Sequence, residues 1–268
     1  MNRTMAVLIA VMLSVFPATV LGQSLPNWSG VWAVPGSVAT GATLFDPATA
    51  NPVGAAGSPG IREHPPYNDE WETLYKKNIE LVNQGRFPDP FTNCGMPAGY
   101  PRIMNLPDVY EFVVTPEQTW IISENGPNIV RIYTDGRAHS APEDRWATFS
   151  GDSVGHWEGD TLVFTTVGVK GWDTDHDSIL DRTGLIISSA MHSMTRMRKI
   201  DDNTIEAQIT IEDPKALTKP WVVTRRYNRL PKGTRVYDYA CGENNRNPVD
   251  ESGRTLTLGP DGRPLDNK

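Results

Sequence analysis

The chain has 268 residues, a formal net charge of −7 at pH 7, and 38% hydrophobic residues. An acidic protein repels the phosphates of nucleic acids and of anionic lipids, so neither is expected as a partner. The length suits one large β domain or two small ones.

The first 22 residues have the pattern of a secretory signal peptide. Arg3 gives a basic start, residues 5–15 form an apolar run, and the small residues Val20 and Gly22 precede the expected cleavage site. The apolar run is too short to span a bilayer comfortably, which disfavours a retained membrane anchor. We therefore expect an exported protein, periplasmic or secreted, with no membrane span once the signal is removed.

Residues 23–109 are predicted to be an irregular segment with one strand and one helix packed on a barrel. The strand is expected at residues 25–32, and residues 35–66 are rich in Gly, Ala and Pro without periodicity. A helix is predicted from its N-cap, Asn68, to Gly85, which ends it. Its apolar stripe, typical of packing against a sheet, comprises Trp71, Leu74, Tyr75, Ile79 and Val82.

From residue 110 the hydrophobic period changes to two, and this change predicts the main fold. Candidate strands recur with turn residues between them, and alternation is cleanest over residues 204–212. The pattern favours a mainly β fold, an antiparallel meander that closes into a lipocalin-like barrel over residues 110–246. Polar groups on both faces of several strands indicate either a partly polar lumen or one face in water. Residues 247–268 are predicted to be a flexible polar tail.

The two cysteines, Cys94 and Cys241, are predicted to form a disulfide. A pair of cysteines in an oxidising compartment most often does so, and closing so long a loop would contribute about 4–5 kcal/mol in the chain-entropy treatment. Two free thiols, one of them a nucleophile, are the alternative. The CxxC spacing of redox and zinc sites is absent.

Residues at strand ends are the candidates for acid/base chemistry, because barrel mouths commonly hold sites and imidazole titrates near neutral pH. The predicted catalytic residues are His139, His192, Glu124 and Tyr133, and the predicted substrate-binding residues are Arg131, Arg196, His156 and Trp157. The alternative is that each is a structural hydrogen-bond partner at the end of a hairpin. GDSVG (151–155) has the spacing of GxSxG, but its serine lies in a strand-like stretch and not at a strand-to-helix turn, so it does not support a serine nucleophile.

Residues 151–162, GDSVGHWEGDTL, are interpreted as two strands joined at Glu158-Gly159-Asp160, with Gly159 free to take a positive φ. Trp157 and Leu162 are expected to pack across this hairpin. By alternation His156 faces away from Trp157. It is a secondary candidate for a catalytic role, after His139 and His192 at the strand ends.

Two groups of side chains are candidates for binding a metal ion. His139, His156 and His192 would suit zinc or iron if the fold brought them together, although no HxH or HxxxH spacing is present. In the loop WDTDHDSILDRTG the alternating carboxylates resemble those of calcium loops, and they are Asp173, Asp175, Asp177 and Asp181. Ser178 and Gly184 stand where an EF-hand needs glycine and glutamate, so a solvated acidic loop is the alternative to calcium.

Several stretches together resemble a family of exported bacterial proteins without an assigned activity. They are PRIMN (101–105), VRIYTDGRAH (130–139), GDSVGHWEGDTLV (151–163), LDRTG (180–184), IEDPKALTKPWVVTRRY (211–227) and YACGENNR (239–246). The resemblance implies a secreted β-rich domain of lipocalin-like or calycin-like character and brings no catalytic residues with it. Family members have Pro-His-Ser where this chain has Ile186-Ile187-Ser188, which weakens any metal or acid/base role for that loop.

The function expected from these features is that of an exported enzyme acting on a small, partly apolar molecule that can carry an anionic group. It would use general acid/base chemistry, as a lyase, isomerase or hydrolase. The alternatives are a barrel that binds such a ligand without converting it, and a structural envelope protein.

Overall fold

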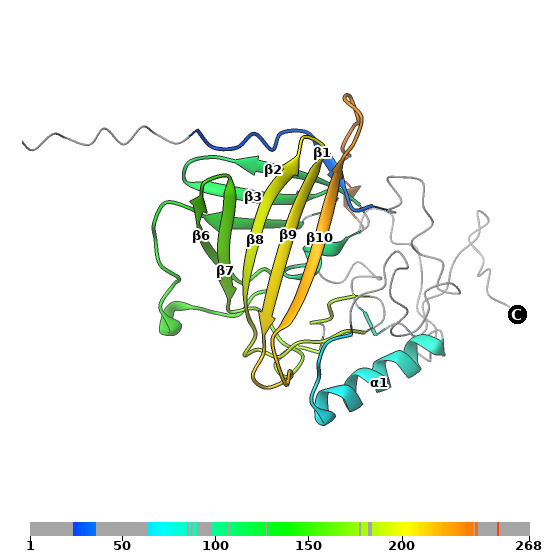
Figure 1. The fold of residues 1–268 in the computed structure, drawn as a ribbon. Helices are drawn as coiled ribbons and strands as arrows, with labels where there is room; N and C mark the ends of the chain where they lie inside the picture. The colour runs from blue at the N-terminus through cyan, green and yellow to red at the C-terminus, as the bar shows by residue number, and fades with distance from the viewer. Residues whose placement is uncertain are drawn as a thin grey trace, which may run out of the picture.

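A computed structural model describes residues 24–35, 64–84, 86, 88–89, 98–106, 108–126, 128–176, 178–181, 184–237, 239–240 and 251. Within these residues, nine strands form a closed barrel, and one α-helix lies below it (Figure 1). The prediction of a mainly β, lipocalin-like barrel with a single helix is confirmed. In the same part of the chain, no helix is long and apolar enough to cross a membrane.

The barrel strands are β1 (Val31–Ala33), β2 (Val109–Val114), β3 (Gln118–Ser123), β5 (Asn128–Tyr133), β6 (Asp152–Glu158), β7 (Thr161–Val167), β8 (His192–Asp201), β9 (Thr204–Glu212) and β10 (Trp221–Arg229). Their order around the barrel is β1-β10-β9-β8-β7-β6-β5-β3-β2, and a separate parallel pair joins β4 (Asn125–Gly126) to β11 (Tyr239–Ala240). In the part of the chain that the structure describes, two short 3₁₀ helices, η3 (Arg102–Asn105) and η4 (Pro142–Asp144), lie in the connections.

The N-terminal strand β1 closes the barrel. Trp32 pairs with Tyr110 of β2 on one side and with Arg229 of β10 on the other. The predicted division, with all barrel strands after residue 109, is therefore wrong at this point. A strand of three residues is too short to show a period of two, which is why alternation alone did not assign it to the barrel.

The link between β5 and β6 departs from a simple meander. These strands are parallel, with Ile132 opposite Ser153 and Tyr133 opposite Val154, and residues 134–151 cross over between them. We call residues 134–151 the crossover segment. The turn sequence TDGR is compatible with both a reversal and a crossover, so the strand direction did not follow from it.

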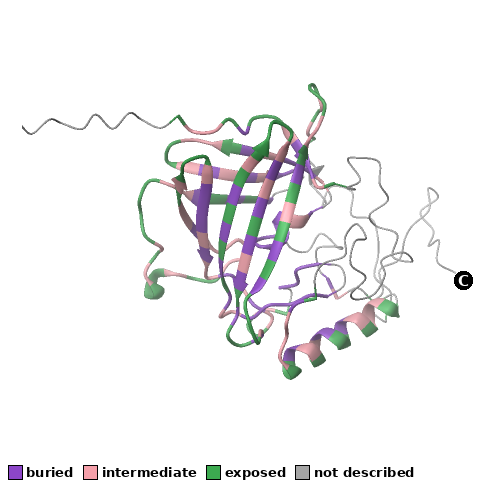
Figure 2. Ribbon diagram, viewed as in Figure 1, coloured by how far each residue is buried: buried purple, intermediate pink, exposed green. Residues whose placement is uncertain are grey.

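The barrel interior is filled by large side chains. Burial alternates along β8, β9 and β10, with the buried positions turned inward (Figure 2). The largest side chains that are less than 2% exposed include Trp28, Trp32, Tyr100, Tyr110, Tyr227 and Phe164. An interior rich in aromatic rings buries much apolar area per residue, which makes it the main source of stability.

The helix α1 (Asp69–Asn83) begins where the sequence predicts, because the Asn68 side chain accepts a hydrogen bond from the Trp71 backbone N–H. Trp71 packs on Ile186 and Ala216, which belong to loops rather than to strands. Asn78 is buried and donates to the Gly184 carbonyl at 3.0 Å. The helix therefore packs against the loops that cover one end of the barrel.

Some predictions fall outside the described residues. They are the signal peptide (1–22), the Cys94–Cys241 disulfide, the Asp177 carboxylate of the calcium loop and, apart from residue 251, the polar tail (247–268).

Candidate functional site

His139 is the predicted catalytic residue that the fold surrounds with suitable partners. Its Nδ1 lies 3.3 Å from Asp152 Oδ2, and its Nε2 lies 2.8 Å from the Thr165 hydroxyl. The His139 and Asp152 side chains are 21% and 19% exposed. A carboxylate, an imidazole and a hydroxyl thus form a chain that is half-buried but open to solvent.

Three separate parts of the fold build this arrangement. His139 lies in the crossover segment, Asp152 begins β6, and Thr165 lies on β7 opposite Val154 of β6. Inward-facing residues of β7, such as Phe164, are buried, whereas Thr165 alternates to the outer face. His139 therefore fastens the crossover segment to the outside of the barrel.

The hydrogen bonds around His139 are consistent with one neutral tautomer. Nδ1–H donates to the Asp152 carboxylate, and Nε2 then accepts the hydrogen bond of the Thr165 hydroxyl. Asp152 Oδ2 also accepts from the Ser140 backbone N–H at 2.8 Å, which fixes the carboxylate. An imidazole oriented by a carboxylate and facing a hydroxyl can remove the hydroxyl proton, as in hydroxyl–histidine–carboxylate triads.

Apolar surface lies next to the Thr165 hydroxyl. Met194 of β8 pairs with Thr165 in the sheet register and is 49% exposed. Trp146, in the same crossover segment as His139, is 81% exposed. Exposed side chains of this size can contact the apolar part of a small molecule.

His192, also predicted to be catalytic, is on the outer face of β8, away from the lumen. It pairs with Glu212 through Nε2 at 2.9 Å, and both side chains are about half exposed, at 50% and 52%. The next inward positions of β8, Ser193 and Thr195, are buried. His192, Arg196 and Arg198 of β8 thus lie on a face in water, whereas its inward polar positions carry only the hydroxyls of Ser193 and Thr195.

The residues predicted to bind substrate do not form a single group. His156 and Arg196 both contact Glu158, at 3.2 and 2.8 Å, on exposed surface. Hydrogen bonds from Arg196 and then His156 hold the pKa of Glu158 below its usual value. Trp157 instead turns inward and packs on Trp28, so His156 and Trp157 face opposite sides, as predicted. The predicted pairing of Trp157 with Leu162, and the positive φ of Gly159, are confirmed.

The other candidates at strand ends have local structural partners. Glu124 accepts a hydrogen bond from the Tyr237 backbone N–H at 3.1 Å. The ring of Tyr133 lies 3.9 Å below the Arg137 guanidinium. Arg131 lies over the ring of Trp120 at 5.7 Å. None of these contacts joins them to His139.

The predicted metal sites do not assemble in the described part of the chain, where no three His, Cys, Asp or Glu side chains gather to hold an ion. His139, His156 and His192 each contact a different carboxylate. Convergence of the three histidines depended entirely on tertiary structure, and the register of the strands separates them.

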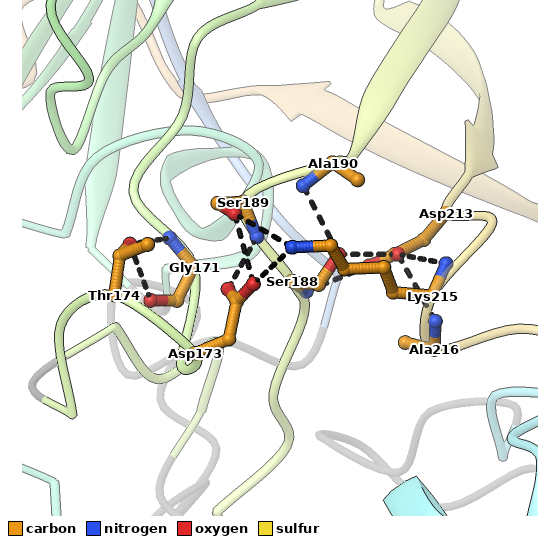
Figure 3. A network of polar contacts seen from close by, with 9 residues as sticks. All are labelled: Gly171, Asp173, Thr174, Ser188, Ser189, Ala190, Asp213, Lys215 and Ala216. Atoms are coloured by element: carbon orange, nitrogen blue, oxygen red, sulfur yellow. Dashed lines mark hydrogen bonds and ion pairs between the residues drawn. The ribbon is translucent and has the colours of Figure 1, made fainter.

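In the proposed calcium loop, the described carboxylates have separate partners. Asp173 accepts from the backbone N–H and the hydroxyl of Ser189, and from the Lys215 ammonium at 2.7 Å (Figure 3). Asp175 accepts from Lys170, and Asp181 from a backbone N–H in its own loop. Lys215 thus supplies the positive charge at Asp173 that a calcium ion would supply.

A buried hydroxyl network inside the barrel was not predicted. The Tyr100 hydroxyl lies 2.7 Å from that of Thr195 and accepts from Ser193 at 3.1 Å. Ser153 and Thr166 form a second hydroxyl pair at 2.8 Å. Burial raises the pKa of Tyr100, despite these hydrogen bonds. These Ser and Thr residues occupy inward positions of regular strands. The one indication of the network in the sequence was that polar residues occur on both faces of several strands.

Comparison of the chain with protein-family models and with curated proteins gives no match.

Proposed function

We propose that this protein is an exported acid/base enzyme that hydrolyses a small, partly apolar acyl compound. The observation that carries the proposal is the chain of contacts from Asp152 through His139 to the Thr165 hydroxyl. Of the three predicted classes (lyase, isomerase and hydrolase) we favour the hydrolase, because an enzyme hydroxyl that is hydrogen-bonded to an imidazole can act as a nucleophile. The exposed Met194 beside Thr165 would contact the apolar part of the substrate.

In the proposed reaction, His139 Nε2 takes the proton from Thr165 Oγ1 as that oxygen attacks the acyl carbon. The alcohol or phenol leaves with a proton from the His139 imidazolium, and an acyl-threonine remains. Water, deprotonated by the same nitrogen, then releases the acid and restores the hydroxyl. Asp152 keeps the imidazole in the tautomer whose Nε2 can accept the proton.

The test uses p-nitrophenyl acetate, whose hydrolysis releases a coloured phenolate. His139→Gln and Thr165→Val should each lower the rate by about 100-fold or more, whereas Thr165→Ser should retain activity because it keeps the hydroxyl. His192→Gln is the matched control, since His192 also pairs with a carboxylate on the outer face. Rapid acid quenching followed by peptide mass spectrometry should find acetyl on Thr165.

Equal loss in His139→Gln and His192→Gln, or acetyl on lysines alone, would contradict the proposal. Circular dichroism of each variant separates loss of chemistry from loss of fold, because His139 also anchors the crossover segment.

A barrel that binds a ligand without converting it is the second candidate function. It is favoured by the closed barrel itself, because barrels of this size can enclose a small ligand. This function is supported over the first if the unsubstituted protein and His139→Gln both bind the ligand saturably and neither forms product.

A further inference from the structure

One side of the barrel has an outer face that is mostly apolar. The strands β2, β3 and β5 are neighbours there, and their inward positions, such as Phe112, Ile121 and Val130, are buried. The alternate positions therefore face outward. Those that reach the surface, which we call the β3 face, are Glu111, Val113, Gln118, Trp120, Ile122, Ile129, Arg131 and Tyr133.

The charges on this face differ from those on the opposite side of the barrel. On the outer face of β9 and β10, Arg226 pairs with Glu206 across neighbouring strands at 2.9 Å. The charged side chains of the β3 face are Glu111 and Arg131, and neither forms an ion pair with another residue that the structure describes. An acid and a base are thus left unpaired on an apolar surface.

The register of the sheet keeps Glu111 and Arg131 apart within one molecule. Glu111 lies in a cross-strand row with Ile122 and Ile129, whereas Arg131 lies in the next row, beside Trp120. Two strand spacings and two residues separate them, which is roughly 12 Å between their Cα atoms. The Arg131 guanidinium lies over the Trp120 ring instead, 5.7 Å from its centroid. The acid and the base are therefore at opposite corners of the face.

This diagonal arrangement is complementary to a second copy of itself. In a two-fold symmetric pair every contact occurs twice, once in each direction. A two-fold axis that lies between two facing sheets and crosses the diagonal at its midpoint places Glu111 opposite the partner's Arg131. The same axis places Arg131 opposite the partner's Glu111. It passes over β3 between Trp120 and Ile122, so apolar side chains fill the centre.

We propose that this protein forms a two-fold symmetric dimer through the β3 face. Contact with the second copy covers Val113 and Ile129, which are 38% and 39% exposed. The central Trp120 and its stacked Arg131 are of the residue types that contribute most to protein interfaces, and the charged pairs fix the relative orientation of the two copies. The face is smaller than a standard interface of roughly 20–30 residues a side, so the dimer is weak and forms at micromolar concentrations.

The dimer goes beyond the proposed hydrolysis and does not depend on it, because His139 and Thr165 lie outside β2, β3 and β5. A failed p-nitrophenyl acetate test leaves it intact.

Sedimentation velocity of the full-length protein, over concentrations that span the micromolar range, tests the proposal. Glu111→Arg and Arg131→Glu each bring like charges together twice, so each should raise the dissociation constant of the dimer by about 10-fold or more. Mixed in equal amounts, the two variants should associate with each other. One then carries positive charge at both positions and the other negative charge at both, which restores two attractive pairs.

A second pair of variants tests the apolar part of the face. Ile129→Ser should weaken the dimer by about 10-fold. Val222→Ser is the matched control and should leave it unchanged, because Val222 is a similarly exposed apolar residue, at 44%, on the outer face of β10. Circular dichroism identifies the folded variants.

The proposal is overturned if the unsubstituted protein is monomeric throughout the range, or if the folded Ile129→Ser or Arg131→Glu variant dimerises unchanged. It is also overturned if the mixture of the two folded charge variants does not associate.

Discussion

Ser188 donates two hydrogen bonds to the Asp213 carboxylate, one from its backbone N–H and one from its hydroxyl, both at 2.6 Å (Figure 3). The same carboxylate accepts from the backbone N–H groups of Lys215 and Ala216. Asp213 is 2% exposed, so its charge is compensated almost entirely by these donors. The turn between β9 and β10 is thereby fixed to the chain that leads into β8.

Removing the Asp213 carboxylate should be more damaging than removing the Ser188 hydroxyl. Asp213→Ala leaves several buried donors unpaired and should cost about 3 kcal/mol or more in the free energy of unfolding. Ser188→Ala removes the hydroxyl that donates to Asp213 and accepts from the Ala190 backbone N–H, but it keeps the backbone hydrogen bond to Asp213, so about 1–2 kcal/mol is expected. Urea unfolding measures both. A larger loss in Ser188→Ala would show that Asp213 is not the centre of the network.

The buried pair of Asp89 and Arg102 should behave as a unit. Two hydrogen bonds of 2.7 Å join the side chains, which are 0% and 7% exposed. Asp89→Ala leaves a buried guanidinium charge without its carboxylate, so a loss of about 3–5 kcal/mol is expected. The double variant with Arg102→Met should lose much less than the sum of the single losses. Additive losses in this double-mutant cycle would contradict a direct coupling.

Buried tyrosines should make the protein sensitive to alkali. Burial raises the pKa of Tyr100, whereas an unfolded tyrosine has a pKa of about 10. The stabilisation that this pKa difference provides is fully present below the unfolded pKa of about 10. It is lost as the pH rises from there through the folded pKa, because over that range the unfolded state has released its proton and the folded state has not. The melting temperature should therefore fall above about pH 10.

Tyr100→Phe tests the contribution of that one residue. It lowers stability at neutral pH, because Ser193 and Thr195 lose a hydroxyl partner. It also flattens the alkaline decline, since one fewer proton is released on unfolding. An unchanged slope of melting temperature against pH would show that Tyr100 ionises in the folded protein.

The contact between Asp173 and Lys215 predicts sensitivity to acid. Partial burial acts to raise the pKa of Asp173, but hydrogen bonds from Lys215 and Ser189 outweigh it and hold that pKa below its usual value. Its stabilisation is present above the unfolded pKa of about 3.9 and is lost as pH falls through the folded pKa. Asp173→Asn should thus lower the melting temperature at pH 7 and have little effect near pH 2. An equal deficit at both pH values would assign the effect to packing rather than charge.

Local patterns predicted the parts of the fold that depend on local interactions. Alternation over β9 placed Ile205, Ala207, Ile209 and Ile211 on one face, and all four are buried. Asn68 caps α1 as expected, and Gly159 takes the left-handed conformation in the turn between β6 and β7. Each of these features is determined by residues within a few positions of one another.

The candidate site was predictable only in part. His139 stood out as a histidine at a strand end, but its partner Thr165 lies 26 positions later and meets it through the crossover segment. His192 and Arg196 matched the same pattern and face solvent, because alternation separates two faces without showing which one is inside. Ser188 and Asp213 are 25 positions apart, and nothing local to either residue indicates the other.

The closing strand β1 has a consequence for how the chain folds. Arg229 at the end of β10 binds the Ser29 carbonyl, a contact spanning 200 positions. Contacts between such distant segments carry a large loop-closure entropy and form slowly. Until β1 docks, β2 and β10 lack the partner strand that joins them, and unpaired strand edges are templates for aggregation. Docking of the three residues Val31–Ala33 therefore covers the edges of β2 and β10 in a single step.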